Sequence, residues 1–388
     1  MSGKKKRILI ILVDRANYGR MKPIMDALSE DNTVEMLTIC AGSMVLERFQ
    51  RTVDVVRDDG FHVHSEVFME LEGSLPVTMA KSLGFGVVEF SSELNRLSPD
   101  LVVLIGDRYE ALAAALAAVY QNICVAHIQG GEVSGSIDES ARHAISKLAH
   151  YHFPSTSESR QNLIRMGESP NTVFNYGCPV GDVIFSMQSN SKRDLSGYYG
   201  LSSFDISEPF FLVIFHPVTT GFGEESQQID AVLEVLAFFQ IQSVMLWPNI
   251  DAGASHIGKR IRTFQKNHDA NYLKMITNLA PSDFQYLLGK TACAIGNSSS
   301  FVRDTSFWGT PVVLLGDRQN GREAAENVTR VPIDFDKIVG AVEQQLRHGR
   351  YLPSTLYGKG DSGKKIAKKL VELEPYKQKR LHVADDND

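Results

Sequence analysis

Three carboxylates in the first half of the chain follow two predicted strands closely enough to meet at one edge of a sheet. Asp107 comes just after the apolar run 101–105, and Glu132 and Asp138 come after the apolar run 123–128. Because the carboxyl ends of parallel strands lie at the same edge of a sheet, we expect the three acids to converge. Converging carboxylates can accept a proton, donate one and stabilise a cationic centre, so this group is the candidate catalytic site.

Structural roles remain open for parts of this group. Asp107 stands just before a predicted helix, where an aspartate commonly caps the helix. Ser136 and Glu139 have the spacing of a capping box, so part of the second loop is a helix start. Glu132 follows two glycines and has no comparable structural explanation.

Hydroxyl groups in the second half of the chain are suited to an anion. Ser298, Ser299 and Ser300 follow the predicted strand 292–295 and open a helix. Free N–H groups at such a helix start, together with hydroxyls, can hold a phosphate or diphosphate. An ordinary serine cap would need only one serine. The chain has no Walker loop and no G-x-G-x-x-G fingerprint after the first strand.

Other polar side chains follow further predicted strands of the second half. They are His216, Asn249, Asp251, Asn297, Arg318 and Arg322. Of these, the two arginines could each hold an anion or be solvated surface.

A regular alternation of strand and helix patterns positions all of these residues. Nearly all-apolar runs, typical of strands buried on both faces, alternate with longer segments of helical periodicity. In the first half the predicted strands are 8–13, 36–40, 101–105, 123–128 and 173–176, and the predicted helices are 21–28, 44–57, 77–97, 109–119 and 157–166. In the second half the strands are 211–215, 244–247, 273–276, 292–295 and 312–315, and the helices are 230–239, 257–267, 282–288 and 335–347.

This pattern predicts an α/β protein with two Rossmann-like domains that face a cleft. A polar, turn-rich passage interrupts the alternation and is typical of a linker. We expect an N-terminal domain over 1–188 with the catalytic acids, a linker over 189–208, a nucleotide-binding domain over 209–360, a closing helix over 361–375 and a flexible tail over 376–388.

Composition excludes several classes of protein. The 388 residues carry a formal net charge of −6, so the chain-wide positive charge of a nucleic-acid-binding protein is absent. The four cysteines are far apart, which favours thiols in a reducing, cytoplasmic compartment over disulfides. His150 and His152 lack a third ligand at suitable spacing, so we expect no metal. The apolar run 8–13 is too short for a signal peptide, and we expect no membrane association.

Several ordered blocks of the sequence resemble the hydrolysing UDP-N-acetylglucosamine 2-epimerases, both the bacterial enzymes and the epimerase half of the bifunctional animal enzyme. The resemblance covers residues 7 to about 372. Its blocks are Arg15-Ala16-Asn17-Tyr18, Gly106-Asp107-Arg108, 127–132, 136–150, 216–220, 248–253, 296–299 and 316–323.

The resemblance implies a glycosyltransferase-B-like fold, a homo-oligomer (dimer or tetramer) and chemistry without a cofactor. It implies that UDP-N-acetylglucosamine and water give UDP and N-acetylmannosamine through 2-acetamidoglucal, for the synthesis of sialic-type acids. The implied catalytic residues are Asp107, Glu132, Asp138 and His216. The implied substrate-binding residues are Arg15, Arg108, Arg142, His143, Asn249, Asp251, Asn297, Ser298, Ser299, Asp304 and Arg318.

Some residues depart from the family pattern and leave the substrate open. Gly19-Arg20 replaces a small, hydroxyl-bearing pattern, and Gln129 and Asp304 stand where glutamate is common. The substrate could therefore be a UDP- or GDP-linked 2,4-diacetamido-2,4,6-trideoxy sugar. A non-hydrolysing epimerase, a glycosyltransferase and a non-catalytic sensor of nucleotide sugars are the alternatives. The first typically carries Arg-Pro-Glu where this chain has Arg15-Ala16-Asn17, and the other two have no clear use for three acids.

Overall fold

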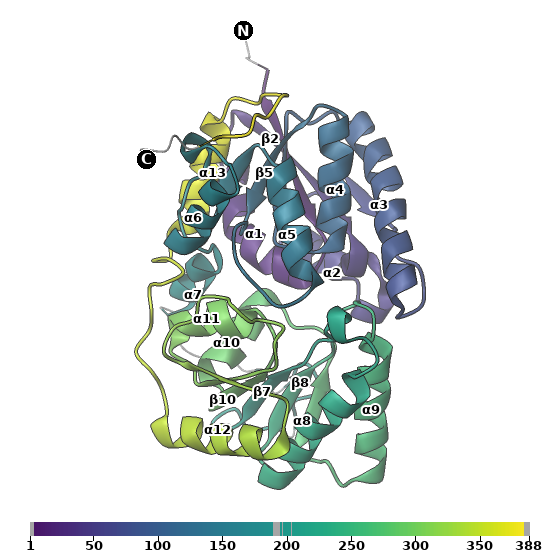
Figure 1. The fold of residues 1–388 in the computed structure, drawn as a ribbon, viewed down its shortest axis with the longest axis vertical. Coiled ribbons are helices and arrows are strands. Elements are labelled where there is room, and N and C mark those ends of the chain that lie inside the picture. Colours follow the sequence, from purple (N-terminus) through teal and green to yellow (C-terminus); the bar gives the residue numbers. More distant parts are fainter. Residues whose placement is uncertain (1–3, 189–194, 196, 203, 384–388) are drawn as a thin grey trace.

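The computed structural model describes residues 4–188, 195, 197–202 and 204–383, and shows two α/β domains stacked end to end (Figure 1). Each domain is built on a six-stranded sheet whose neighbouring strands are all parallel. The predicted α/β class with two Rossmann-like domains is thereby confirmed. Part of the predicted linker (189–194, 196 and 203) and part of the predicted tail (384–388) lie outside the described residues.

The first sheet has the strand order β3-β2-β1-β4-β5-β6. Its strands are β1 (Lys6–Leu12), β2 (Val34–Ala41), β3 (Ser65–Val67), β4 (Leu101–Ile105), β5 (Cys124–Ile128) and β6 (Tyr151–Phe153). Its helices are α1 (Arg15–Ser29), α2 (Thr52–Asp58), α3 (Pro76–Leu97), α4 (Tyr109–Tyr120), α5 (Ile137–Leu148), α6 (Ser157–Arg165) and α7 (Val180–Gln188).

The second sheet has the order β12-β11-β10-β7-β8-β9. Its strands are β7 (Phe211–Ile214), β8 (Ser243–Leu246), β9 (Leu273–Ile276), β10 (Cys293–Gly296), β11 (Val312–Leu315) and β12 (Val328–Val331). Its helices are α8 (Glu225–Phe239), α9 (Ala254–Asn267), α10 (Pro281–Lys290), α11 (Ser300–Trp308) and α12 (Phe335–His348).

Alternate residues of the central strands pack on opposite faces of each sheet. In β1, Ile8 and Ile10 belong to the apolar core on one face, whereas Leu9 and Ile11 belong to the core on the other. This follows from the two-residue period of a strand, and it explains why the strands are continuous apolar runs. Helices cover both faces, so the polar loops are left at the strand ends.

Several details of the secondary structure differ from the predictions, and β6 and α7 are additional elements. The predicted strand 173–176 forms only an isolated bridge between Val173 and His152. The predicted helix 44–57 is helical in its last part (α2), after two short 3₁₀ turns. The edge strands β3 and β12 were not predicted, because each is short and includes polar residues.

The C-terminal segment returns to the first domain. Helix α13 (Ser362–Glu372) packs against α1, and beyond it the Tyr376 hydroxyl donates to the His150 carbonyl at 3.1 Å. The Lys379 ammonium donates to the Ser146 carbonyl at 2.9 Å. Residues 376–383, which were expected to form a flexible tail, thus make specific polar contacts with the first domain. In the described part of the chain, no helix is both long and apolar enough to cross a membrane.

Candidate active site

A cavity of roughly 1400 Å³, which includes space open to solvent, lies between the two sheets where their strand ends face each other. Ten of the fifteen predicted site residues line it: Arg15, Asp107, Arg108, Asp138, His216, Asn249, Ser298, Ser299, Asp304 and Arg318. The other five are not among the residues that line it: Glu132, Arg142, His143, Asp251 and Asn297. The structure thus brings together strand-end residues from both domains.

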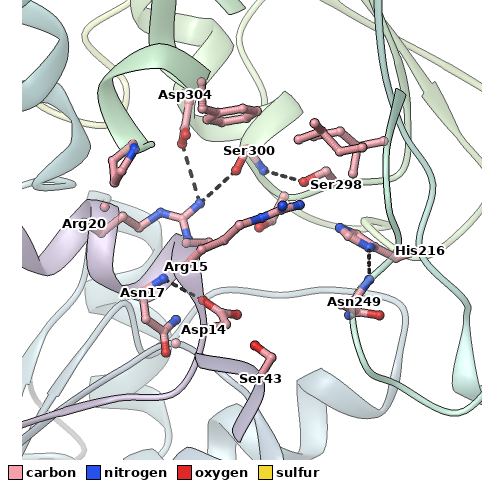
Figure 2. A pocket seen from close by; sticks show the side chains of 18 of the residues that line it. Asp14, Arg15, Asn17, Arg20, Ser43, His216, Asn249, Ser298, Ser300 and Asp304 are labelled. Atoms are coloured by element: carbon pink, nitrogen blue, oxygen red, sulfur yellow. Dashed lines mark hydrogen bonds and ion pairs between the residues drawn. The ribbon is translucent and has the colours of Figure 1, made fainter. Parts of the chain in front are cut away.

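The N-terminus of α11 points into the cavity and carries the three serines. Gly296 precedes them at φ +145, and a Cβ there would lie 1.8 Å from the carbonyl oxygen of Ile214, so only glycine fits. The Ser298 hydroxyl accepts from the Ser300 N–H at 3.3 Å (Figure 2). Because the first N–H groups of a helix lack helical partners, this end of α11 is suited to a diphosphate.

His216 is a neutral imidazole that faces the cavity. Its Nδ1 accepts from the backbone N–H of Asn249 at 3.2 Å (Figure 2), which leaves the proton of the neutral ring on Nε2. Burial lowers the pKa of His216 well below its ordinary value, and Arg318 and Arg15 lower it further. His216 can therefore donate a hydrogen bond to a ligand while remaining uncharged.

Asn297 supports His216 from behind. The Asn297 amide donates to the His216 carbonyl, and the His216 N–H donates to the Asn297 side-chain oxygen, both at 2.8 Å. This reciprocal pair ties the loop after β7 to the loop after β10. The predicted binding residue Asn297 thus positions its neighbours and does not line the cavity.

Asp107 is ionised and held by arginines. Its carboxylate pairs with Arg142, which is fully buried, and lies 3.8 Å from Arg322. Burial alone would raise the pKa of Asp107, but Arg142 and Arg322 outweigh it and hold the pKa below its usual range. Asp107 therefore presents a fixed negative charge to the cavity at any physiological pH.

Asp138 has the opposite electrostatic setting. Burial raises the pKa of its carboxyl group, the negative charge of Asp107 adds to the rise, and Arg318 opposes it. One Asp138 oxygen accepts from Arg318 at 3.0 Å. Two nearby carboxyl groups whose pKa values are shifted in opposite directions are suited to different roles in one reaction.

Glu132 is buried in a clamp of two arginines from the second domain. Arg303 donates from Nε to Oε1 at 3.0 Å and from Nη2 to Oε2 at 2.6 Å, and Arg322 contacts the same carboxylate. Burial would raise the pKa of Glu132, but Arg303 and Arg322 outweigh it and lower the pKa to about 2. The structure therefore places Glu132 as an ionised group that does not line the cavity.

Arg142, His143 and Asp251 also act at one remove from the cavity. Arg142 donates to the Glu132 carbonyl at 2.8 Å in addition to its pair with Asp107. His143 contacts Glu139 at 2.8 Å, and Asp251 lies 3.1 Å from Arg108. Each of these three side chains thus contacts a neighbouring charged or polar group and does not line the cavity.

Sequence reasoning missed several residues that build the site. Arg303 was not singled out, although it stands one helical turn after Ser299 and donates to the Ser299 hydroxyl at 3.1 Å. Glu110 has no distinguishing pattern in the sequence; it is fully buried and accepts from Arg108 at 2.8 Å. Arg20 was noted as a departure from the family pattern but not as a site residue, and it lines the cavity.

Two Rossmann-like domains that place a helix N-terminus suited to an anion opposite a set of carboxylates are typical of the glycosyltransferase-B-like class of fold. The chain belongs to the UDP-N-acetylglucosamine 2-epimerase family, whose model matches residues 26–371. The family assignment predicted from the sequence is confirmed.

Three similar proteins place the chain within this family. A UDP-N,N'-diacetylbacillosamine 2-epimerase (hydrolyzing) of Legionella pneumophila is 33% identical over 374 residues, which cover 96% of this chain and 97% of that protein. A UDP-N-acetylglucosamine 2-epimerase of Neisseria meningitidis is 28% identical, with 92% of each covered. The crystal structure of a Neisseria meningitidis UDP-GlcNAc 2-epimerase bound to UDP-GlcNAc is 19% identical and has a TM-score of 0.78, with 95% of this chain and 100% of that chain covered, which shows the same fold.

Proposed function

We propose that the protein is a hydrolysing 2-epimerase, which converts a UDP-linked 2-acetamido sugar and water into UDP and the free C2 epimer. The observation that carries this proposal is that Asp107 and Asp138, with pKa values shifted in opposite directions, line the same cavity as the serines of α11. A diphosphate bound at the serines would place the attached sugar between the two carboxylates.

The first step is an elimination. Asp138, whose raised pKa makes it the better proton acceptor, takes the C2 proton as the C1–O bond breaks and UDP leaves with the bonding electrons. Asp107 stabilises the positive charge that develops at C1. The N–H groups of α11, together with Arg318 and the Nε2–H of His216, stabilise the departing diphosphate.

The second step is the addition of water to the double bond between C1 and C2. The oxygen of water bonds to C1 as a base accepts its proton, and a solvent-derived proton is added to the face of C2 opposite to the one that lost its proton in the first step, which inverts that carbon. Glu132 holds Arg303 and Arg322 in place during both steps. This role differs from the direct catalytic role implied by the resemblance.

For the sugar, we propose the UDP-2,4-diacetamido-2,4,6-trideoxy class ahead of UDP-N-acetylglucosamine. The printed function of the Legionella relative, 33% identical over nearly the whole chain, supports this order. The product would then be the corresponding 2-epimer and would serve the synthesis of sialic-type acids; with UDP-N-acetylglucosamine it would be N-acetylmannosamine.

Incubation of the protein with each nucleotide sugar in D2O, followed by NMR, tests the proposal. We expect free 2-epimer with deuterium at C2, together with accumulating UDP. A UDP-linked epimer in equilibrium with its substrate would identify a non-hydrolysing enzyme. Absence of turnover with both sugars would contradict the proposed function. The ratio of kcat/KM for the two sugars decides the substrate.

We further propose a cytoplasmic homo-oligomer. The four cysteines are all buried and unpaired, which supports a reducing compartment. Apolar side chains such as Phe85 and Val88 on α3 are half or more exposed, which supports burial of this face between subunits. Light scattering of the purified protein measures the number of subunits, and a mass of 43.0 kDa would contradict the oligomer.

A further inference from the structure

Arg20 crosses the cleft from the first domain to the second. It lies on α1 and lines the cavity, and its Nη2 donates to the Ser300 hydroxyl at 3.1 Å. The same Nη2 lies 3.6 Å from Oδ1 of Asp304 on α11 (Figure 2). The guanidinium therefore sits directly beside the helix end that is suited to a diphosphate.

The guanidinium of Arg20 has too few partners for its burial. The residue is only 6% exposed, yet its Nε has no hydrogen-bond partner, and the contact with Asp304 is too long for a hydrogen bond. Buried guanidinium groups normally satisfy most of their five N–H donors. The Nε–H donor is thus without an acceptor in a residue that lines the cavity.

Asp304 shows the matching deficit. It is 2% exposed, its Oδ2 accepts from the Gln285 amide at 2.7 Å, and its Oδ1 has no hydrogen bond. The two side chains therefore neutralise each other loosely. A stronger acceptor for Arg20 and a donor for Asp304 would improve both environments.

We propose that Arg20, from the first domain, is a ligand of the diphosphate, and that it pairs with Asp304 until the nucleotide binds. The inference rests on the proposed nucleotide site. A phosphate group accepts two N–H bonds from one guanidinium, a geometry that the carboxylate of Asp304 does not offer Arg20 here. When Arg20 turns to the phosphate, Oδ1 of Asp304 becomes free to accept a hydroxyl group of the nucleotide.

The exchange has a consequence for selectivity. A ligand with a diphosphate gains Arg20 and thereby links the two domains, whereas a nucleoside without phosphate leaves Arg20 on Asp304. Arg20 therefore distinguishes ligands by their phosphate, and Asp304 opposes the binding of a bare diphosphate because that ligand must remove its counter-ion.

Titration calorimetry with UDP, uridine and inorganic diphosphate tests the exchange without requiring turnover. Arg20→Gln should weaken UDP binding by about tenfold to a hundredfold, the value of one or two charge-assisted hydrogen bonds. Uridine binding should change by less than about twofold, within the precision of such comparisons. Asp304→Asn should tighten the binding of inorganic diphosphate, because the counter-ion of Arg20 is gone.

Two further variants serve as controls. Lys22→Gln, on the same helix, removes a lysine that pairs with Asp26 and does not line the cavity, and it should leave all three affinities unchanged. Arg20→Lys keeps the charge and should bind UDP with intermediate affinity, which covers the case in which Arg20→Gln fails to fold.

Wild-type UDP affinity in folded Arg20→Gln, or unchanged diphosphate affinity in Asp304→Asn, would overturn the inference. If the epimerase reaction fails but UDP binding depends on Arg20, the inference stands and the proposed function falls. If the epimerase reaction is observed but UDP binding does not depend on Arg20, the proposed function stands and the inference falls.

Discussion

Glu132 and Arg303 form a buried ion pair between the two domains, with donor–acceptor distances of 3.0 Å from Nε and 2.6 Å from Nη2. The two residues are 171 positions apart in the sequence. Arg322 contacts the same carboxylate, so one acid of the first domain binds two arginines of the second. A buried ion-pair cluster of Glu132, Arg303 and Arg322 therefore links the two domains.

Removal of the ion pairs of Glu132 should destabilise the protein strongly. In Glu132→Gln two buried guanidinium groups lose their counter-ion, and breaking such a pair typically costs about 3–5 kcal/mol. We expect a lower free energy of unfolding in urea and a loss of turnover. Glu158→Gln, which removes the partner of Arg165 in an exposed pair, is the control and should change stability by about 1 kcal/mol or less. Equal stability of the two variants would contradict the role of Glu132.

The same carboxylate should make stability depend on pH. Because the pKa of Glu132 falls from 4.5 to about 2 in the folded protein, the folded state binds fewer protons than the unfolded state between these values. The resulting stabilisation, up to about 3 kcal/mol, is fully present above pH 4.5 and is lost as the pH falls towards 2. Urea unfolding from pH 2 to pH 6 measures it. In Glu132→Gln the corresponding part of the pH dependence should be absent; an unchanged slope would assign it to other acids.

The acid side of the activity profile should report Asp138. As the proposed base it must be deprotonated, so kcat falls when the pH drops below its raised pKa. Arg318→Gln removes a cation that lowers this pKa, so the fall in kcat should move to higher pH. Asp138→Asn should lose about a hundredfold or more in kcat and retain UDP affinity. A profile of kcat that does not move in Arg318→Gln would exclude Asp138 as the group that titrates.

A close approach at Gly135 should make closure of the domains sensitive to a single methyl group. The Gly135 N–H donates to the Arg318 carbonyl at 3.1 Å, and a Cβ at this position would lie 1.9 Å from the carbonyl oxygen of Asp317. Gly135→Ala should therefore hold the domains apart, increase the radius of gyration in X-ray scattering and reduce turnover. Gly84→Ala on α3, where a Cβ meets nothing within 4 Å, is the matched control and should be neutral or slightly stabilising. A compact, active Gly135→Ala variant would show that the loop can yield.

Patterns within short segments predicted most of the architecture. The apolar runs at β1, β4 and β5 indicated buried strands, and their ends correctly placed Asp107 and Asp138 at one cavity. The run 173–176 misled because its aromatic residues also alternate; Phe174 and Tyr176 pack in the core beside α13 without pairing as a strand. Local periodicity does not distinguish these two ways of burying an aromatic side chain.

The partners across the cleft could not be predicted in the same way. Whether Glu132 faces a substrate or two arginines depends on how two separately folded domains meet, and no local pattern encodes that contact. Arg303 resembles any helical arginine until Glu132 is seen beside it. Arg142 and Asp251 lie outside the cavity lining for the same reason: their charged partners, Asp107 and Arg108, are set by tertiary packing.

The return of α13 to the first domain also restricts how the molecule can move. Because residues 4–188 and 362–383 build one domain, the other domain is an insertion attached by two chain segments. The Cys178 N–H donates to the Tyr357 carbonyl, so the chain just before α7 lies beside the segment that returns to α13. A body tethered along one edge by two adjacent connections can swing about that edge, but it can neither slide nor twist freely. The two domains should therefore open and close about a hinge beside α7, and ligands should enter the cleft from the side opposite to this hinge.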